Sequence, residues 1–83
     1  MSPAKQAALA RVNNAETRLK GEGKAWNIAN TSQIDIIKSH INDGDSYETA
    51  KRKFGEIYDD HESRYKKALQ EVFEAHKEYR EAP

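Results

Sequence analysis

Apolar and polar positions follow the period of an α-helix in two long stretches, one on each side of the chain's midpoint. In the second stretch, residues that can face an apolar neighbour recur at steps of three or four, with a mean spacing of about 3.6 residues. This pattern predicts a helix over residues 46–81. Its stripe consists of Tyr47, Ala50, Phe54, Ile57, His61, Tyr65, Ala68, Val72, His76 and Tyr79.

The first stretch predicts a helical arm over residues 3–41. Ser2 is placed to cap its start, and Pro3 occupies the first helical position, where a missing N–H costs nothing. Its apolar stripe keeps one phase only if a glycine and an asparagine count as small members. The stripe then reads Ala8, Val12, Ala15, Leu19, Gly23, Trp26, Asn30, Ile34, Ile37 and Ile41.

Two features oppose an unbroken first helix. Gly21 and Gly23 together cost about 2 kcal/mol of helix propensity, and residues 27–32 are a cluster of poor helix formers. Ser32, with Asp35 three residues later, also has the spacing of a capping box. The arm is therefore either one long helix or two helices with a break near residues 28–32.

The segment Asn42-Asp43-Gly44-Asp45-Ser46 separates the two stretches and predicts a turn over residues 42–45. Asp45 or Ser46 can cap the second helix, with Glu48 in the capping-box position after Asp45. The oxygen-rich segment lacks the ligand spacing of a calcium loop, so helix capping explains it better than a metal does. The fold class expected is all-α: residues 1–83 form one domain, an antiparallel helical hairpin or its three-helix variant.

Charge supports an antiparallel fold. The chain has 14 basic and 14 acidic residues. Residues 1–41 carry six basic and three acidic groups, and residues 42–83 carry eight basic and eleven acidic groups. Folding the chain back lays the positive arm against the negative arm, a weak attraction. The second stretch also has three acid-before-base pairs at helical spacing, which are Glu48–Arg52, Asp60–Arg64 and Glu62–Lys66.

The composition limits the class of protein. The chain has no cysteine, which fits a reducing compartment, and no apolar run of membrane-spanning length or signal-peptide character. A soluble, cytoplasmic protein is expected. At 83 residues, a single core leaves only a few kcal/mol of net stability, so association would help it.

No catalytic chemistry stands out. The Gly21-Glu22-Gly23-Lys24 segment suggests a phosphate loop, but Arg18 and Ala25 stand where that motif needs Gly and Ser or Thr. The histidines are His40, His61 and His76, and they have no metal-ligand spacing. His61 and His76 are expected in the helical seam. We therefore expect no enzyme activity, no cofactor and no metal.

Aromatic side chains lie on more than one line of the second helix, which widens its apolar face beyond what one partner helix covers. Such a surplus is usually buried against another copy or another protein. The sequence therefore predicts an interaction or adaptor module that self-associates as a homodimer. The expected contact residues are Trp26, Tyr47, Phe54, Tyr58 and Phe73.

The alternative prediction is a small regulator or inhibitor that contacts nucleic acid or a nucleic-acid enzyme. Basic residues cluster at two places on the second helix, although acidic residues share their face and the net charge is zero. The contact residues would be Lys51, Arg52, Lys53, Arg64 and Lys67.

Overall fold

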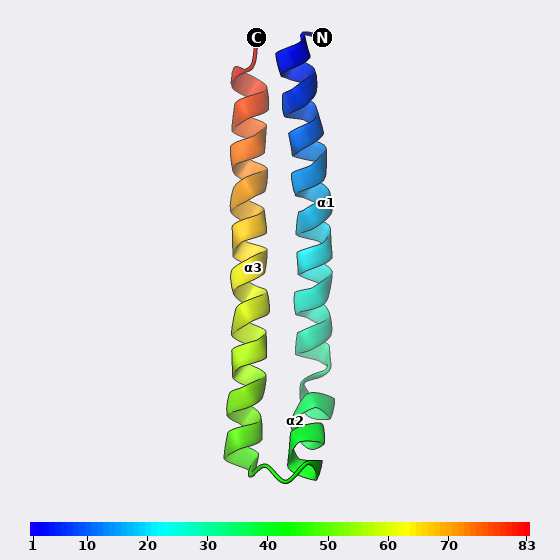
Figure 1. Cartoon of the computed structure of the whole chain (residues 1–83), viewed down its shortest axis with the longest axis vertical. Helices are drawn as coiled ribbons and strands as arrows, with labels where there is room; N and C mark the ends of the chain where they lie inside the picture. The colour runs from blue at the N-terminus through cyan, green and yellow to red at the C-terminus, as the bar shows by residue number, and fades with distance from the viewer.

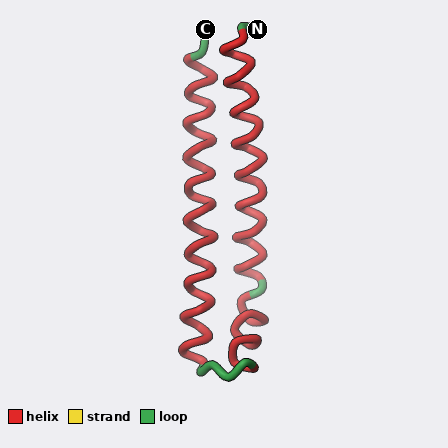
Figure 2. Tube along the Cα trace, in the orientation of Figure 1, coloured by secondary structure: helices red, strands yellow, loops and turns green.

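The computed structural model describes all 83 residues as three helices that form an antiparallel rod (Figure 1). Helix α1 spans Pro3–Thr31, α2 spans Gln33–Asn42 and α3 spans Tyr47–Glu81. The α1 and α2 helices follow one another along α3, and both termini lie at the same end (Figure 2). The rod measures 59 × 14 × 14 Å. The all-α hairpin is confirmed, in its three-helix form.

Serine side chains cap the two long helices. Ser2 Oγ accepts a hydrogen bond from the Lys5 amide at 3.1 Å, and Ser46 Oγ accepts one from the Thr49 amide at 3.2 Å. Pro3 begins α1 as predicted. Of the two possible caps of α3, the structure selects Ser46, so no capping box joins Asp45 to Glu48.

The first arm is interrupted at Ser32 alone. The Ser32 amide still donates to the Ile28 carbonyl at 2.9 Å, and the Ile36 amide donates to the Ser32 carbonyl at 3.0 Å. The Ser32 side chain makes no capping hydrogen bond, so the predicted capping box with Asp35 does not form. The break therefore lies at the end of the predicted cluster of poor helix formers, residues 27–32, and not at the two glycines, which α1 contains. It offsets α2 from α1 without reversing its direction.

The seam between α1 and α3 is built from alanine. Eight residues are buried, six of them alanines. In the cluster at the terminal end, Val12, Ala15 and Ala75 are buried together, with Val72 and Tyr79 packed against them. Small side chains on one helix thus face larger ones on the other, which lets the two backbones approach closely. The eight are Ala8, Val12, Ala15, Ala29, Ala50, Phe54, Ala68 and Ala75.

The seam of α3 repeats every seven residues. Phe54, Ala68 and Ala75 are buried on this spacing, with His61 half-buried between them. A seven-residue repeat is the signature of two helices that coil around each other. Three members of the predicted stripe are exposed. The predicted spacing of 3.6 drifts out of phase with the repeat, so His76 is exposed beside buried Ala75 and Ile57 is more exposed than Tyr58. Tyr47, the first residue of α3, is 57% exposed.

The first arm shows the same drift near the break. Asn30 and Ile34 were predicted on the buried stripe, but both are exposed, Ile34 by 75%. Ile41 is also exposed, by 40%. The buried residue next to Asn30 is Ala29. The stripe therefore moves back by one position between Trp26 and α2, because only the seven-residue repeat stays in contact with α3.

Ion pairs join the two arms. Arg11 pairs with Glu78, and Arg18 with Glu71 at 2.8 Å, so basic groups of α1 meet acidic groups of α3. Within α3, the predicted pairs Asp60–Arg64 and Glu62–Lys66 form at 3.0 and 3.1 Å. Glu48–Arg52 does not form, because Arg52 instead binds Glu56 at 3.2 Å. All these side chains are partly exposed, so each pair contributes at most about 1 kcal/mol.

Candidate functional site

Three of the five predicted contact residues meet in the seam. The Trp26 ring lies 6.0 Å from that of Tyr58 and 5.1 Å from that of Tyr65, and Phe54 lies 6.0 Å from Tyr58. Phe54 is buried, and Trp26 and Tyr58 are half-buried. The cluster therefore belongs mainly to the intramolecular packing, and Tyr65 joins it because it lies seven residues after Tyr58.

Tyr47 and Phe73 lie apart from this cluster. Tyr47 begins α3 at the turn and is 57% exposed, whereas Phe73 is 68% exposed and lies 26 residues further along the helix. The five predicted residues therefore share no single face. Their role in binding a partner stays a prediction. Only Tyr47 and Phe73 could contact a partner while the seam between the helices stays packed.

The basic clusters are largely neutralised within the chain. Arg52 pairs with Glu56 and Arg64 with Asp60, while Lys53 Nζ lies 2.7 Å from Asp45 Oδ2. Lys51 and Lys67 are left without an ion pair. Two isolated lysines on one helix do not make the continuous positive surface that phosphate backbones need.

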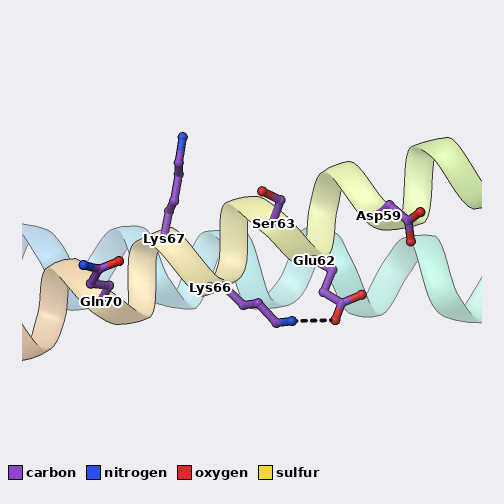
Figure 3. Close-up of a pocket in the computed structure, with 6 residues that line it drawn as sticks. All are labelled: Asp59, Glu62, Ser63, Lys66, Lys67 and Gln70. Atoms are coloured by element: carbon purple, nitrogen blue, oxygen red, sulfur yellow. Dashed lines mark ion pairs between the residues drawn. The ribbon is translucent and has the colours of Figure 1, made fainter.

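The outer face of α3 carries a shallow polar depression (Figure 3), but its side chains do not converge. Lys66 points toward Glu62, whereas Lys67 extends away from that ion pair. No lining residue is hydrophobic, and all come from one helix, so the depression offers neither enclosure nor opposed catalytic groups. Its lining residues are Asp59, Glu62, Ser63, Lys66, Lys67 and Gln70.

The three histidines lie apart from one another, and each has different neighbours. His76 Nε2 lies 2.8 Å from Glu16, and His40 Nδ1 lies 3.7 Å from Asp45. His61 sits in the seam, where its Nδ1 is buried without a hydrogen-bond partner. No group of three or more His, Asp or Glu side chains is arranged to hold a metal ion.

The charges around the turn lower the pKa of the Asp45 carboxyl. The hydrogen bond from Lys53, followed by the positive charges of Lys53, His40 and Arg52, lowers the pKa of Asp45 below its usual value of 3.8. These groups tie the turn to the start of α3. The lowered pKa therefore reflects an ion pair that stabilises the turn at the tip of the rod. No cavity of the structure is lined by Asp45.

The rod has two long flanks, one on each side of the seam. We call the first the Arg18 flank; it carries the pairs Arg11–Glu78 and Arg18–Glu71. Seven-residue steps from Arg18 lead to Ala25 and Ser32, which line an apolar hollow of about 440 Å³ near the break. Its lining residues are Ala25, Ile28, Ala29, Ser32, Ile36, Ile57 and His61.

We call the opposite side the His76 flank, because the Glu16–His76 pair crosses the seam there. Seven-residue steps from Glu16 lead to Gly23 and Asn30, which line a second hollow of about 310 Å³ together with Trp26, Asn27 and Tyr58. Leu69, seven residues before His76 on α3, is half-buried on this flank.

Comparison of the chain with protein-family models, with curated proteins and with solved structures finds no match. No helix of the structure is long and apolar enough to cross a lipid bilayer. The arrangement of its own residues is therefore the basis for a functional proposal. Chemically, that arrangement offers two partly apolar flanks.

Proposed function

We propose that this protein is a non-enzymatic interaction module that works by self-association. One observation carries the proposal: the buried core is mostly alanine, while large apolar side chains stay in solvent. Ile28, Ile34 and Phe73 are 53%, 75% and 68% exposed, and Ile57 is 38% exposed. Ile28 and Ile57 line the same apolar hollow, and a contiguous exposed apolar surface is characteristic of contact with another chain.

The shape supports the same proposal. At each level of the rod only two helices lie side by side, so most of their surface faces water. Helices of another chain would cover a flank along its whole length. Since a single core of this size leaves little net stability, docking of another chain on a flank would also stabilise the hairpin.

The proposed location is the cytoplasm, where a chain without cysteine loses no stabilising disulfide. A role as a regulator that contacts nucleic acid is the weaker proposal. Three of its five basic residues, Arg52, Lys53 and Arg64, are engaged in ion pairs within α3 or with the turn. A salt-dependent shift of labelled DNA or RNA on mixing with the protein would favour that role.

Sedimentation equilibrium of the unmodified chain tests the interaction module directly. The mass should rise from that of one chain toward that of two between micromolar and millimolar concentration. A single-chain mass over this whole range would contradict self-association. A parallel pull-down would then show whether a different protein occupies the flanks.

A further inference from the structure

Two polar side chains with unused hydrogen-bonding capacity line the apolar hollow of the Arg18 flank. Ser32 lies at the break between α1 and α2, and its side chain makes no capping hydrogen bond. His61 lies on α3, and its Nδ1 atom is buried without a partner. The break in the first arm and the unpaired imidazole therefore meet at one place on the rod.

The walls of this hollow are apolar and partly open to solvent. Five of its seven lining residues are alanine or isoleucine, and its volume is about 440 Å³. Two of these residues, Ile28 and Ile57, are 53% and 38% exposed. A concave apolar surface of this size with a few polar groups is the usual form of a small-molecule site. The hollow therefore has the composition of such a site.

The imidazole of His61 determines which kind of molecule fits. Its Nδ1 atom is enclosed by the chain, whereas Nε2 is not among the buried atoms that lack a partner. Nε2 is therefore the ring nitrogen that a ligand can reach. In a neutral imidazole one nitrogen donates and the other accepts, so a ligand hydroxyl, which does both, can pair with Nε2 in either tautomer.

The absence of formal charge in the hollow also restricts the ligand. No lysine, arginine, aspartate or glutamate lines it. A charged ligand would lose its hydration with no opposite charge beside it, so a neutral ligand suits the hollow better. The hydroxyl of Ser32 offers a second uncharged partner for the polar group of the ligand.

We infer that this hollow binds a small neutral molecule that has a ring as its apolar body and one hydroxyl group. The hydroxyl pairs with His61 Nε2, and the ring packs against isoleucines of three helices, Ile28, Ile36 and Ile57. The inference goes beyond the proposed self-association and does not depend on it. Exposed apolar side chains that do not line the hollow, such as Ile34 and Phe73, stay available to a second chain.

Naphthol and naphthalene are a matched pair of probes, because they share one apolar body and differ in a hydroxyl. Each is titrated into isotope-labelled protein at a concentration where sedimentation gives the mass of one chain, and amide chemical shifts are followed by NMR. Naphthol should give saturable shifts confined to residues 25–36 and 57–61. It should bind roughly threefold to tenfold more tightly than naphthalene, which is the effect of one hydrogen bond. Equal affinities, shifts spread along both flanks or no saturable binding would overturn the inference.

A substitution of the imidazole tests its hydrogen bond to the ligand. His61→Leu keeps a side chain of similar size in the seam, so naphthalene should bind as before while the preference for naphthol disappears. His76→Leu is the matched control, because His76 lies on the opposite flank, and it should keep the full preference. A preference that survives in His61→Leu would show that the hydroxyl does not pair with this imidazole, and the inference would fail.

A filling substitution tests the place of binding. Ala25→Leu puts a larger side chain into the hollow and should weaken both probes about tenfold or more, with unchanged helicity by circular dichroism. Ala10→Leu, which is exposed and outside the hollow, should leave both affinities unchanged. Undiminished binding to Ala25→Leu would mean that the probes bind elsewhere and would overturn the site.

Failure of this site and failure of the proposed function give different results. An unmodified chain that stays monomeric at every concentration would contradict self-association and leave the hollow as a ligand site. Loss of the difference between naphthol and naphthalene would contradict the ligand site and leave self-association standing.

Discussion

Gly23 lies directly against the ring of Tyr65: a Cβ atom at position 23 would stand 3.2 Å from Tyr65 Cε2. A Cβ atom at that distance would be closer than ordinary van der Waals packing allows. The absence of a side chain at position 23 therefore lets α1 and α3 approach each other at the middle of the rod. The Tyr65 ring in turn packs on Trp26. The glycine that weakens helix propensity is therefore part of the aromatic packing.

Alanine and leucine substitutions at Gly21 and Gly23 separate propensity from packing. A Cβ atom at position 21 would meet no neighbouring atom within 4 Å, so Gly21→Ala should stabilise the protein by about 1 kcal/mol through helix propensity alone. At position 23, alanine gains the same propensity but displaces the Tyr65 ring, and the net change should be near zero. Gly23→Leu should cost about 1–3 kcal/mol. Urea unfolding measures these variants together with Gly21→Leu as the control, and equal stability of the two leucine variants would contradict the close approach.

Overpacking of the alanine seam should be costly. Ala75 is fully buried between Val12 and Ala15, so Ala75→Leu has no space and should destabilise the protein by about 1–3 kcal/mol. Ala10→Leu is the control, because Ala10 is exposed on the same rod and its substitution should change stability by less than about 0.5 kcal/mol. Thermal unfolding compares them. Similar transition temperatures for the two variants would mean that the helices are not closely packed at Ala75.

Most of the fold could be predicted from the sequence, because the helical period, the Ser2 cap and the central turn are local signals. The exact buried stripe could not. A spacing of 3.6 and one of 3.5 residues differ by only about 20° per seven residues, so the two diverge slowly. The divergence exchanges His76 for Ala75 and Ile57 for Tyr58 in the seam. Alanine at seven-residue spacing was the signal that would have resolved it.

The candidate contact residues were harder to predict for a related reason. An aromatic residue on a helix can fill the seam or face solvent, and a shift of the buried stripe by one residue decides between the two. Trp26 and Tyr58 fill the seam, whereas Phe73 faces solvent. The long-range contacts Arg18–Glu71 and Glu16–His76, which define the two flanks, require the register of α1 against α3. No local pattern contains that register.

The turn should depend on glycine at position 44. Gly44 has φ of +106°, a backbone conformation that L side chains rarely adopt. Gly44→Ala should therefore cost about 1–2 kcal/mol. Gly55→Ala is the control, since it lies in a helix with open space around its Cβ position and should stabilise the protein. Chemical denaturation that finds the two variants equally stable would contradict the strained turn.

The ionic lock at the turn should make stability depend on pH through Asp45. Because Lys53 lowers the pKa of the folded Asp45 carboxyl, the unfolded chain binds its proton first as the pH falls. The contribution of Asp45 is thus fully present above the usual pKa of 3.8 and is lost as the pH falls through the lowered folded value. The transition temperature of the unmodified protein should exceed that of Asp45→Asn at pH 6, and the difference should disappear at about pH 2.

Asp43→Asn is the control, since Asp43 lies in the same turn without an ion pair, and it should show a smaller difference at pH 6. A gap between the unmodified protein and Asp45→Asn that stays constant across this range would show that the carboxylate charge does not stabilise the turn.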